Sequence, residues 1–138
     1  MSWPYVQESG RIYWPDGRMG EVGYSGHGPG VNNPDFERLK GIGPIPCGWY
    51  SMQPPDTDPE LGEYVIRLVP HAQNQMFSRS GFCWHGDELH HLGEQLASHG
   101  CIVHSRQMRQ EGWESGDHII HVIARPVPPV DIDGEISV

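Results

Sequence analysis

The sequence has few basic residues, with nine Lys and Arg against 18 Asp and Glu and a formal net charge of −9. Nucleic acids and anionic membrane surfaces attract basic proteins, so we expect neither as a partner. No apolar run approaches the ~18 residues that a membrane-spanning helix needs. The first residues, Met1 to Tyr5, lack the basic and apolar regions of a signal peptide. We therefore expect a protein made in the cytoplasm without a signal peptide or a membrane span.

Long helical patterns are also missing, whereas Gly (18) and Pro (13) are abundant. Five Trp, five Tyr and a hydrophobic fraction of 36% argue against disorder. Short β-prone runs separated by turn signals predict strands at 5–6, 11–14, 19–24, 49–52, 63–69, 81–85 and 117–124. A helical turn is expected at 34–39 with Asn33 as its N-cap, and a helix at 104–114.

These elements predict one mainly β domain over residues 1–138, a small sandwich or partly closed barrel with one short helix after Cys101. The acidic, Pro-rich linker at 54–62 is expected to be a solvated hairpin end, and the near-continuous apolar run at 117–124 is typical of a buried strand. The tail at 126–138 is expected to be extended and peripheral. In the strand at 81–85, period-two alternation places Phe82 and Trp84 on one face and Cys83 and His85 on the other. His85 should therefore point away from the aromatic core.

The densest polar cluster lies between Arg79 and His104 and contains Cys101. A thiol with a pKa near ~8.5 needs a base or a cationic neighbour to act as a nucleophile, and a paired imidazolium can depress that pKa. Both His85 and His99 could supply this partner, and sequence distance alone does not choose between them. Gly100, directly before Cys101, permits close approach of a substrate and lets backbone amides point at an oxyanion.

The motif Ser98-His99-Gly100-Cys101, preceded by His85-Gly86, resembles the catalytic signature of the L,D-transpeptidases, cysteine enzymes that act on peptidoglycan stem peptides. Further segments resemble a compact branch of that family among type VI secretion effectors: Tyr24-Ser25-Gly26, Asn32-Asn33-Pro34, Gly43-Pro44-Ile45-Pro46 and Arg79-Ser80-Gly81-Phe82. Together they cover residues 24–124. The resemblance implies a β-sandwich or partly closed barrel of the L,D-transpeptidase type.

The same resemblance implies residue roles and no metal or cofactor. The catalytic positions would be Cys101, His85, Gly86 and His99, and the substrate-binding positions Arg79, Tyr24, Asp87, Ser98 and Gly100. Cys101 would be the nucleophile and His85 its base, oriented by the carbonyl of Gly86. His99 and Ser98 would either react or shape the loop through hydrogen bonds, and Arg79 would bind a substrate carboxylate.

The implied reaction is attack of Cys101 on the carbonyl joining the third, diamino-acid residue of a tetrapeptide stem to its terminal D-alanine. Water, a free D-amino acid or a second stem would then accept the acyl group. As an antibacterial effector, the protein would be delivered to the periplasm of a target bacterium by secretion-apparatus components. A cognate immunity protein would accompany it.

Three cysteines cannot all pair within one monomer. Cys83 has no glycine-flanked loop and is expected to be inert filler, although after export Cys47 and Cys83 could pair and leave Cys101 free.

Two other functions stay open. Asp87 and the histidines at 85, 90, 91, 99 and 104 could form a zinc hydrolase site, although their spacing matches no common zinc motif. Alternatively, Trp and Tyr side chains could serve a noncatalytic cell-wall-binding β module.

Overall fold

The computed structural model describes residues 1–88 and 97–126 of the chain. Its strands are β1 (Trp3–Val6), β2 (Arg11–Tyr13), β3 (Met19–Val22), β4 (Tyr24–Ser25), β5 (Gly48–Met52), β6 (Asp56–Asp58), β7 (Gly62–Pro70), β8 (Cys83–His85), β9 (Ile102–Val103) and β10 (Ile119–Ile123). Two 3-10 turns, η1 (Gly28–Gly30) and η2 (Pro34–Phe36), precede β5, and one α-helix, α1 (Arg106–Glu114), follows β9. The described chain is mainly β with one short helix after Cys101, as predicted.

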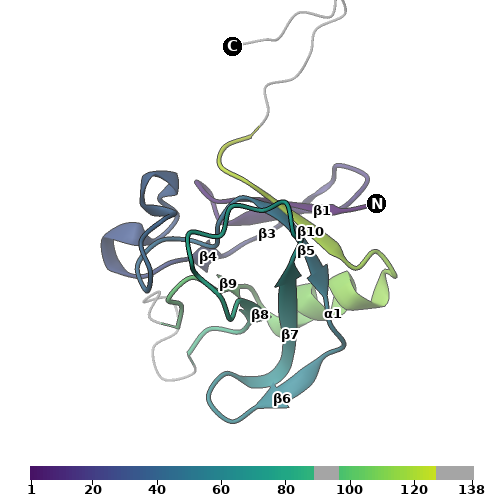
Figure 1. The fold of residues 1–138 in the computed structure, drawn as a ribbon. Coiled ribbons are helices and arrows are strands. Elements are labelled where there is room, and N and C mark those ends of the chain that lie inside the picture. The colour runs from purple at the N-terminus through teal and green to yellow at the C-terminus, as the bar shows by residue number, and fades with distance from the viewer. Residues whose placement is uncertain (89–96, 127–138) are drawn as a thin grey trace, which may run out of the picture.

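The strands form one sheet in the order β3-β2-β1-β10-β5-β7-β8-β9-β4, with β6 paired to β7. β3 and β4 lie at opposite ends of this order, yet only Gly23 separates them in the chain. The two ends of the sheet must therefore approach each other, which curls the sheet into a nearly closed barrel (Figure 1). A Cβ atom at Gly23 would lie 1.8 Å from the carbonyl oxygen of Val103 in β9, so this junction requires glycine.

Large aromatic side chains fill the barrel, among them the fully buried Trp3, Tyr5, Tyr50 and Trp84. The helix α1 packs against β7 and β8 and contributes Met108 to this core. Gly112 of α1 faces Trp84 so closely that a Cβ atom there would meet the indole ring at 2.5 Å. The core thus holds β8, the strand that carries His85, rigidly against the helix.

Several predicted elements differ from the structure in their bounds. The helix begins at Arg106 instead of 104, because the Ser105 hydroxyl accepts a hydrogen bond from Met108 N at 3.2 Å and caps it. The predicted turn at 34–39 is the 3-10 turn η2, capped by Asn33 as expected. The acidic linker before β7, expected to be a solvated hairpin end, contains β6.

The strand predicted at 117–124 is β10 (Ile119–Ile123), and its expected full burial is wrong. β10 alternates between buried and half-buried residues, because one face packs on the core and the other carries His121 stacked on Trp49.

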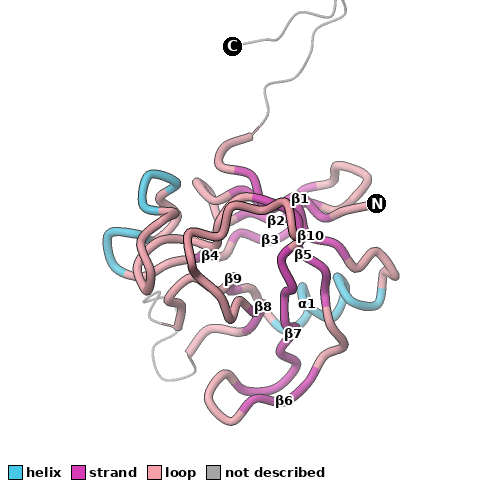
Figure 2. The backbone as a smooth tube through the Cα atoms, viewed as in Figure 1, coloured by secondary structure: helices cyan, strands magenta, loops and turns pink. Residues whose placement is uncertain are grey.

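The predicted tail lies outside the described residues from 127 onward. Among the described residues, no helix is long and apolar enough to cross a membrane. The turns η1 and η2 lie together on one side of the barrel, away from α1 (Figure 2).

Candidate active site

The strands β8 and β9 run parallel and place the two predicted catalytic residues on one face of the sheet. Their register pairs Trp84 with Ile102 and His85 with Val103, so one step earlier Cys83 lies opposite Cys101. Trp84 belongs to the aromatic core, and side chains alternate along a strand. His85, Cys83 and Cys101 therefore share the face that points away from that core, with His85 and Cys101 as diagonal neighbours.

The His85 ring is held at one nitrogen and left open at the other. Its Nδ1 lies 2.8 Å from the carbonyl oxygen of Gly86, and its Nε2 is buried without a hydrogen-bond partner among the described residues. Burial lowers the pKa of His85, so the ring is neutral near pH 7. A neutral ring that donates Nδ1–H to Gly86 leaves a lone pair on Nε2, which is the state of a general base.

The Cys101 thiol does not contact that lone pair in this structure. Its Sγ accepts a hydrogen bond from Cys83 N at 3.3 Å and lies 3.9 Å from the carbonyl oxygen of Gly81. The pKa of Cys101 is raised by the neighbouring Cys83 thiol and by burial. The Cys101 thiol is therefore neutral near pH 7 in this conformation. A neutral thiol needs a base to remove its proton when it reacts.

Ser98 organises the loop that carries Cys101. The buried Ser98 hydroxyl accepts hydrogen bonds from Gly26 N at 3.1 Å and Gly100 N at 3.0 Å, and it donates to the Cys101 carbonyl oxygen at 2.6 Å. The Gly100 amide, predicted to face an oxyanion, is thus bound to Ser98. Gly100 has a φ of 142°, and a Cβ atom there would lie 2.9 Å from the Phe82 ring. Glycine is required at this position for backbone and space together.

Ser25 joins this loop to the Gly43-Pro44-Ile45-Pro46 segment. Its hydroxyl donates to the Gly100 carbonyl oxygen at 2.9 Å and accepts from Ile45 N at 2.8 Å. The sequence showed Ser25 only as part of a motif and assigned it no role. The hydrogen-bonding of the two segments to one hydroxyl explains why these motifs occur together.

Arg79 is buried, with 5% of its surface exposed, and it binds the same two segments. Its Nη2 donates to the carbonyl oxygens of Gly43 at 2.9 Å and His99 at 3.4 Å, and its Nη1 donates to that of Pro44 at 2.8 Å. A guanidinium that serves several backbone carbonyls stabilises loops. The structure thus gives Arg79 a positioning role, and its binding of a substrate carboxylate stays a prediction.

The other predicted site residues flank this loop. The Tyr24 hydroxyl donates to Asp87 Oδ1 at 2.6 Å and accepts from Ala97 N at 3.0 Å. His99 points away from His85 toward the Gly41 carbonyl oxygen at 3.3 Å, and its ring stacks on His27 with centroids 4.7 Å apart. His99 therefore shapes the loop surface, whereas His85 faces the side of Cys101.

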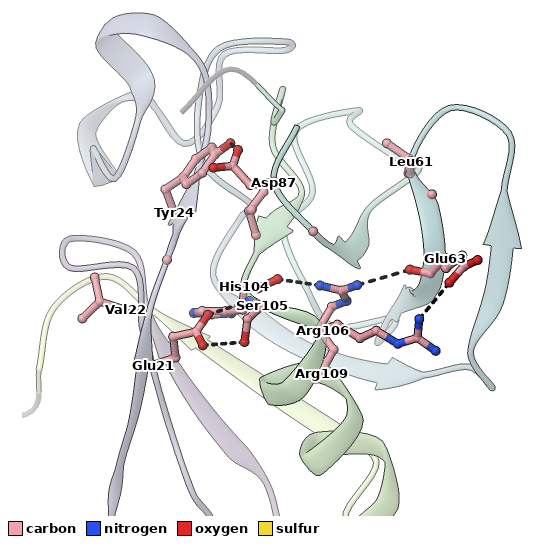
Figure 3. A pocket seen from close by; sticks show the side chains of 14 residues that line it. Glu21, Val22, Tyr24, Leu61, Glu63, Asp87, His104, Ser105, Arg106 and Arg109 are labelled. Atoms are coloured by element: carbon pink, nitrogen blue, oxygen red, sulfur yellow. Dashed lines mark hydrogen bonds and ion pairs between the residues drawn. The ribbon is translucent and has the colours of Figure 1, made fainter. Parts of the chain in front are cut away.

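A cavity of about 910 Å³ adjoins the site on the side of Gly86 and Val103. Figure 3 shows Tyr24 and Asp87 pointing toward each other in its wall, with Glu63, Arg106 and Arg109 on the opposite wall. The buried Arg109 is engaged with the carbonyl oxygens of Tyr64, Glu63 and His104. The cavity is large enough for part of a peptide and carries charges of both signs.

The described residues hold no group of three or more side chains suited to bind a metal ion. The predicted ligand His104 is buried in the core, where Nδ1 accepts from Trp84 Nε1 at 2.9 Å and Nε2 donates to the Gly10 carbonyl at 2.9 Å. His90 and His91, which the zinc hypothesis also included, lie outside the described residues. All three cysteines, which the structure describes, are free thiols.

Cys83, which the sequence indicated only as inert filler, is a second residue of this site whose position sequence reasoning missed. Alternation placed it on the His85 face, but nothing in the sequence paired the strand at 81–85 with the residues after Cys101. A parallel pairing between β8 and β9 was the missing signal, because it places Cys83 beside the candidate nucleophile.

Comparison with known protein families gave one match, the Tlde1 domain, over residues 20–126. Neither the curated proteins nor the solved structures gave a significant match. The matched range contains all the described residues of the site and every strand from β4 to β10. It covers most of the chain, so this protein belongs to the Tlde1 domain family of type VI secretion effectors.

Proposed function

We propose that this effector is a cysteine L,D-transpeptidase or L,D-carboxypeptidase that acts on peptidoglycan tetrapeptide stems. The observation that carries the proposal is the buried Nε2 of His85, which has no partner among the described residues and lies on the face that holds Cys101. Leaving a buried polar atom unpaired costs about 1–3 kcal/mol. On the face that holds Cys101, the open Nε2 is free to accept a proton during the reaction.

In the proposed reaction, the Cys101 side chain turns from the Cys83 amide toward Nε2 of His85 and gives up its proton there. The sulfur attacks the carbonyl carbon between the diamino-acid residue and D-alanine, and the Cys101 amide donates to the oxyanion. A donor of this kind supplies ~3 kcal/mol. The C–N bond breaks, His85 returns the proton to the leaving amine, and a thioester remains. The Gly86 carbonyl stabilises the charged ring through Nδ1–H.

The cavity beside Gly86 is where we place the rest of the stem. Asp87, Glu21 and Glu63 line it, and carboxylates suit the side-chain ammonium of a diamino acid. Tyr24 holds Asp87 in the cavity wall. Water, a free D-amino acid or the amine of a second stem completes the reaction by attacking the thioester.

The biological setting follows from the proposed substrate. Peptidoglycan lies in the periplasm, so the effector would act there after delivery by the secretion apparatus, and a producing cell would need an immunity protein. One assay distinguishes this proposal from the two alternatives, a noncatalytic module and a zinc hydrolase.

That assay incubates the reduced protein with purified tetrapeptide fragments, with and without free D-methionine, and follows products by mass spectrometry. We expect loss of D-alanine, its exchange, or a cross-linked product, each unaffected by EDTA. The matched pair is Cys101→Ala, which should be inactive, and Cys47→Ala, which should be active. Turnover that survives in Cys101→Ala, or that disappears with EDTA, would contradict the cysteine mechanism. Binding without turnover would identify a noncatalytic module.

A further inference from the structure

We infer that Cys83 and Cys101 are a redox-sensitive dithiol, in which Cys83 resolves oxidised Cys101 by closing a disulfide on it. The effect on activity rests on the proposed function, in which Cys101 is the nucleophile. The disulfide itself does not depend on that function, so the two can fail separately.

The backbone places the two cysteines at the spacing that a disulfide needs. They occupy opposing positions one step before the Trp84–Ile102 pair of the parallel strands β8 and β9. Neighbouring strands lie ~4.8 Å apart, within the ~4.4–6.8 Å between Cα atoms that disulfides span. Their side chains share one sheet face, and Cys101 Sγ lies 3.3 Å from Cys83 N. The bond therefore requires side-chain rotation without rearrangement of the strands.

The environments of the two sulfurs suit different steps. Cys83 is only 3% exposed, whereas Cys101 is partly exposed and meets a soluble reagent first. Arg67 Nη1 lies 3.6 Å from Cys83 Sγ. In the reduced protein, the contact with Cys101 and the charge of Arg67 lower the pKa of Cys83 to about 7, and the Arg67 charge remains in place once Cys101 is oxidised. A thiolate is the attacking species in thiol–disulfide exchange, so the buried Cys83 is suited to the second, resolving step.

A small-molecule disulfide such as oxidised glutathione is the oxidant in this scheme. Cys101 loses its proton to a base, and the thiolate attacks one sulfur of the glutathione disulfide, which forms a mixed disulfide and releases one glutathione. Cys83 then attacks the Cys101 sulfur and releases the second glutathione. The protein loses two electrons and two protons, and the small disulfide gains both as two thiols. A thiol reductant reverses the reaction.

Cys47 provides the matched control. Burial and the neighbouring Glu37 carboxylate raise its pKa to about 12, so its thiol stays protonated. Its neighbour is the Glu37 carboxylate and not a second thiol, although the sequence left its pairing with Cys83 open. In the reduced protein the nucleophile is open, and the disulfide closes it until a thiol reductant opens it again.

The test treats the full-length reduced chain with oxidised glutathione and examines it by intact mass, thiol counting after denaturation, and peptide mapping. We expect a loss of about 2 Da, a fall from three free thiols to one, and a peptide linking Cys83 to Cys101. Cys47→Ser should behave the same. In Cys83→Ser and in Cys83→Ala, Cys101 should instead retain one glutathione, with the fold checked by circular dichroism.

The inference is overturned if wild-type Cys101 keeps its glutathione as the Cys83 variants do, or if Cys47 is found in the linkage. Turnover of tetrapeptides is measured on the same samples. It should fall to the level of Cys101→Ala on oxidation and return with dithiothreitol. A mapped disulfide in a protein that never turns over substrate would contradict the proposed function alone.

Discussion

The hydroxyl of Ser98 donates a 2.6 Å hydrogen bond to the carbonyl oxygen of Cys101, three residues later in the chain. The Ser98 hydroxyl oxygen itself accepts hydrogen bonds from the amides of Gly26 and Gly100. One side chain thereby fixes the backbone on which the proposed nucleophile sits and ties it to the segment after β4. The loop geometry thus depends on a buried polar group with all of these partners satisfied.

Ser98→Ala should destabilise the protein and slow turnover. It leaves two amides and one carbonyl of a buried loop without their partner, which typically costs ~1–3 kcal/mol for such groups. Urea unfolding should show this loss, and Ser80→Ala, at an exposed serine, should show none. Equal stability of the two variants would mean that the loop does not depend on this hydroxyl.

His85→Ala should slow the alkylation of Cys101 by iodoacetamide, because it removes the proposed base, which lies on the same sheet face as Cys101. His99→Ala should not, since His99 points toward Gly41 and stacks on His27. The rates are measured from pH 5 to pH 10 in a Cys47→Ser, Cys83→Ser background, so that only Cys101 reacts. If only His99→Ala lowers the reactivity, the base is His99 and the assignment to His85 is wrong.

Cys101→Ala should abolish turnover and leave the fold intact, because it deletes one sulfur at a loop position. Reduced Cys83→Ala and Cys47→Ala should keep turnover, since the contact from Cys83 that holds Cys101 is made by a backbone amide. Product release from tetrapeptide fragments measures all three. An inactive but folded Cys83→Ala protein would show that its thiol takes part in the reaction.

The free energy of unfolding should decrease as the pH falls from about 6.5 to 4. Burial lowers the pKa of His104 to about 4, so over this range the unfolded chain binds a proton that the folded chain excludes. The stability is fully present above pH 6.5, and at most about 3 kcal/mol of it is lost by pH 4. Urea unfolding at several pH values should show a shallower dependence in His104→Gln. An unchanged slope in that variant would exclude His104 as its source.

Toxicity should require export to the periplasm, where the proposed substrate lies. Removing or exchanging the terminal D-alanine of tetrapeptides would deplete donors for one class of cross-link and weaken the wall of growing cells. The chain is expressed with and without an export signal, alongside Cys101→Ala, and lysis and wall composition are followed. Killing from the cytoplasm, or by exported Cys101→Ala, would indicate a different target.

Much of the fold followed from local patterns. Alternation and turn signals predicted most of the strands, and the cap residues of η2 and α1 are ordinary polar residues beside helical segments. The strand β6 was missed, because Asp has a low β-propensity and Asp56 and Asp58 form a strand by pairing with β7. The burial of β10 was misjudged because an apolar run does not show which face a tertiary neighbour covers.

The sequence by itself determined the residue types of the site, their order along the chain, and the separation of His85 from the aromatic core, because side-chain alternation is a property of any strand. Only the tertiary structure decided what each residue contacts. It bound Arg79 to backbone carbonyls, turned His99 outward and placed Cys83 beside Cys101. These outcomes depend on the parallel pairing of β8 with β9, and strand pairing is set by non-local packing and sheet closure, which local sequence does not encode.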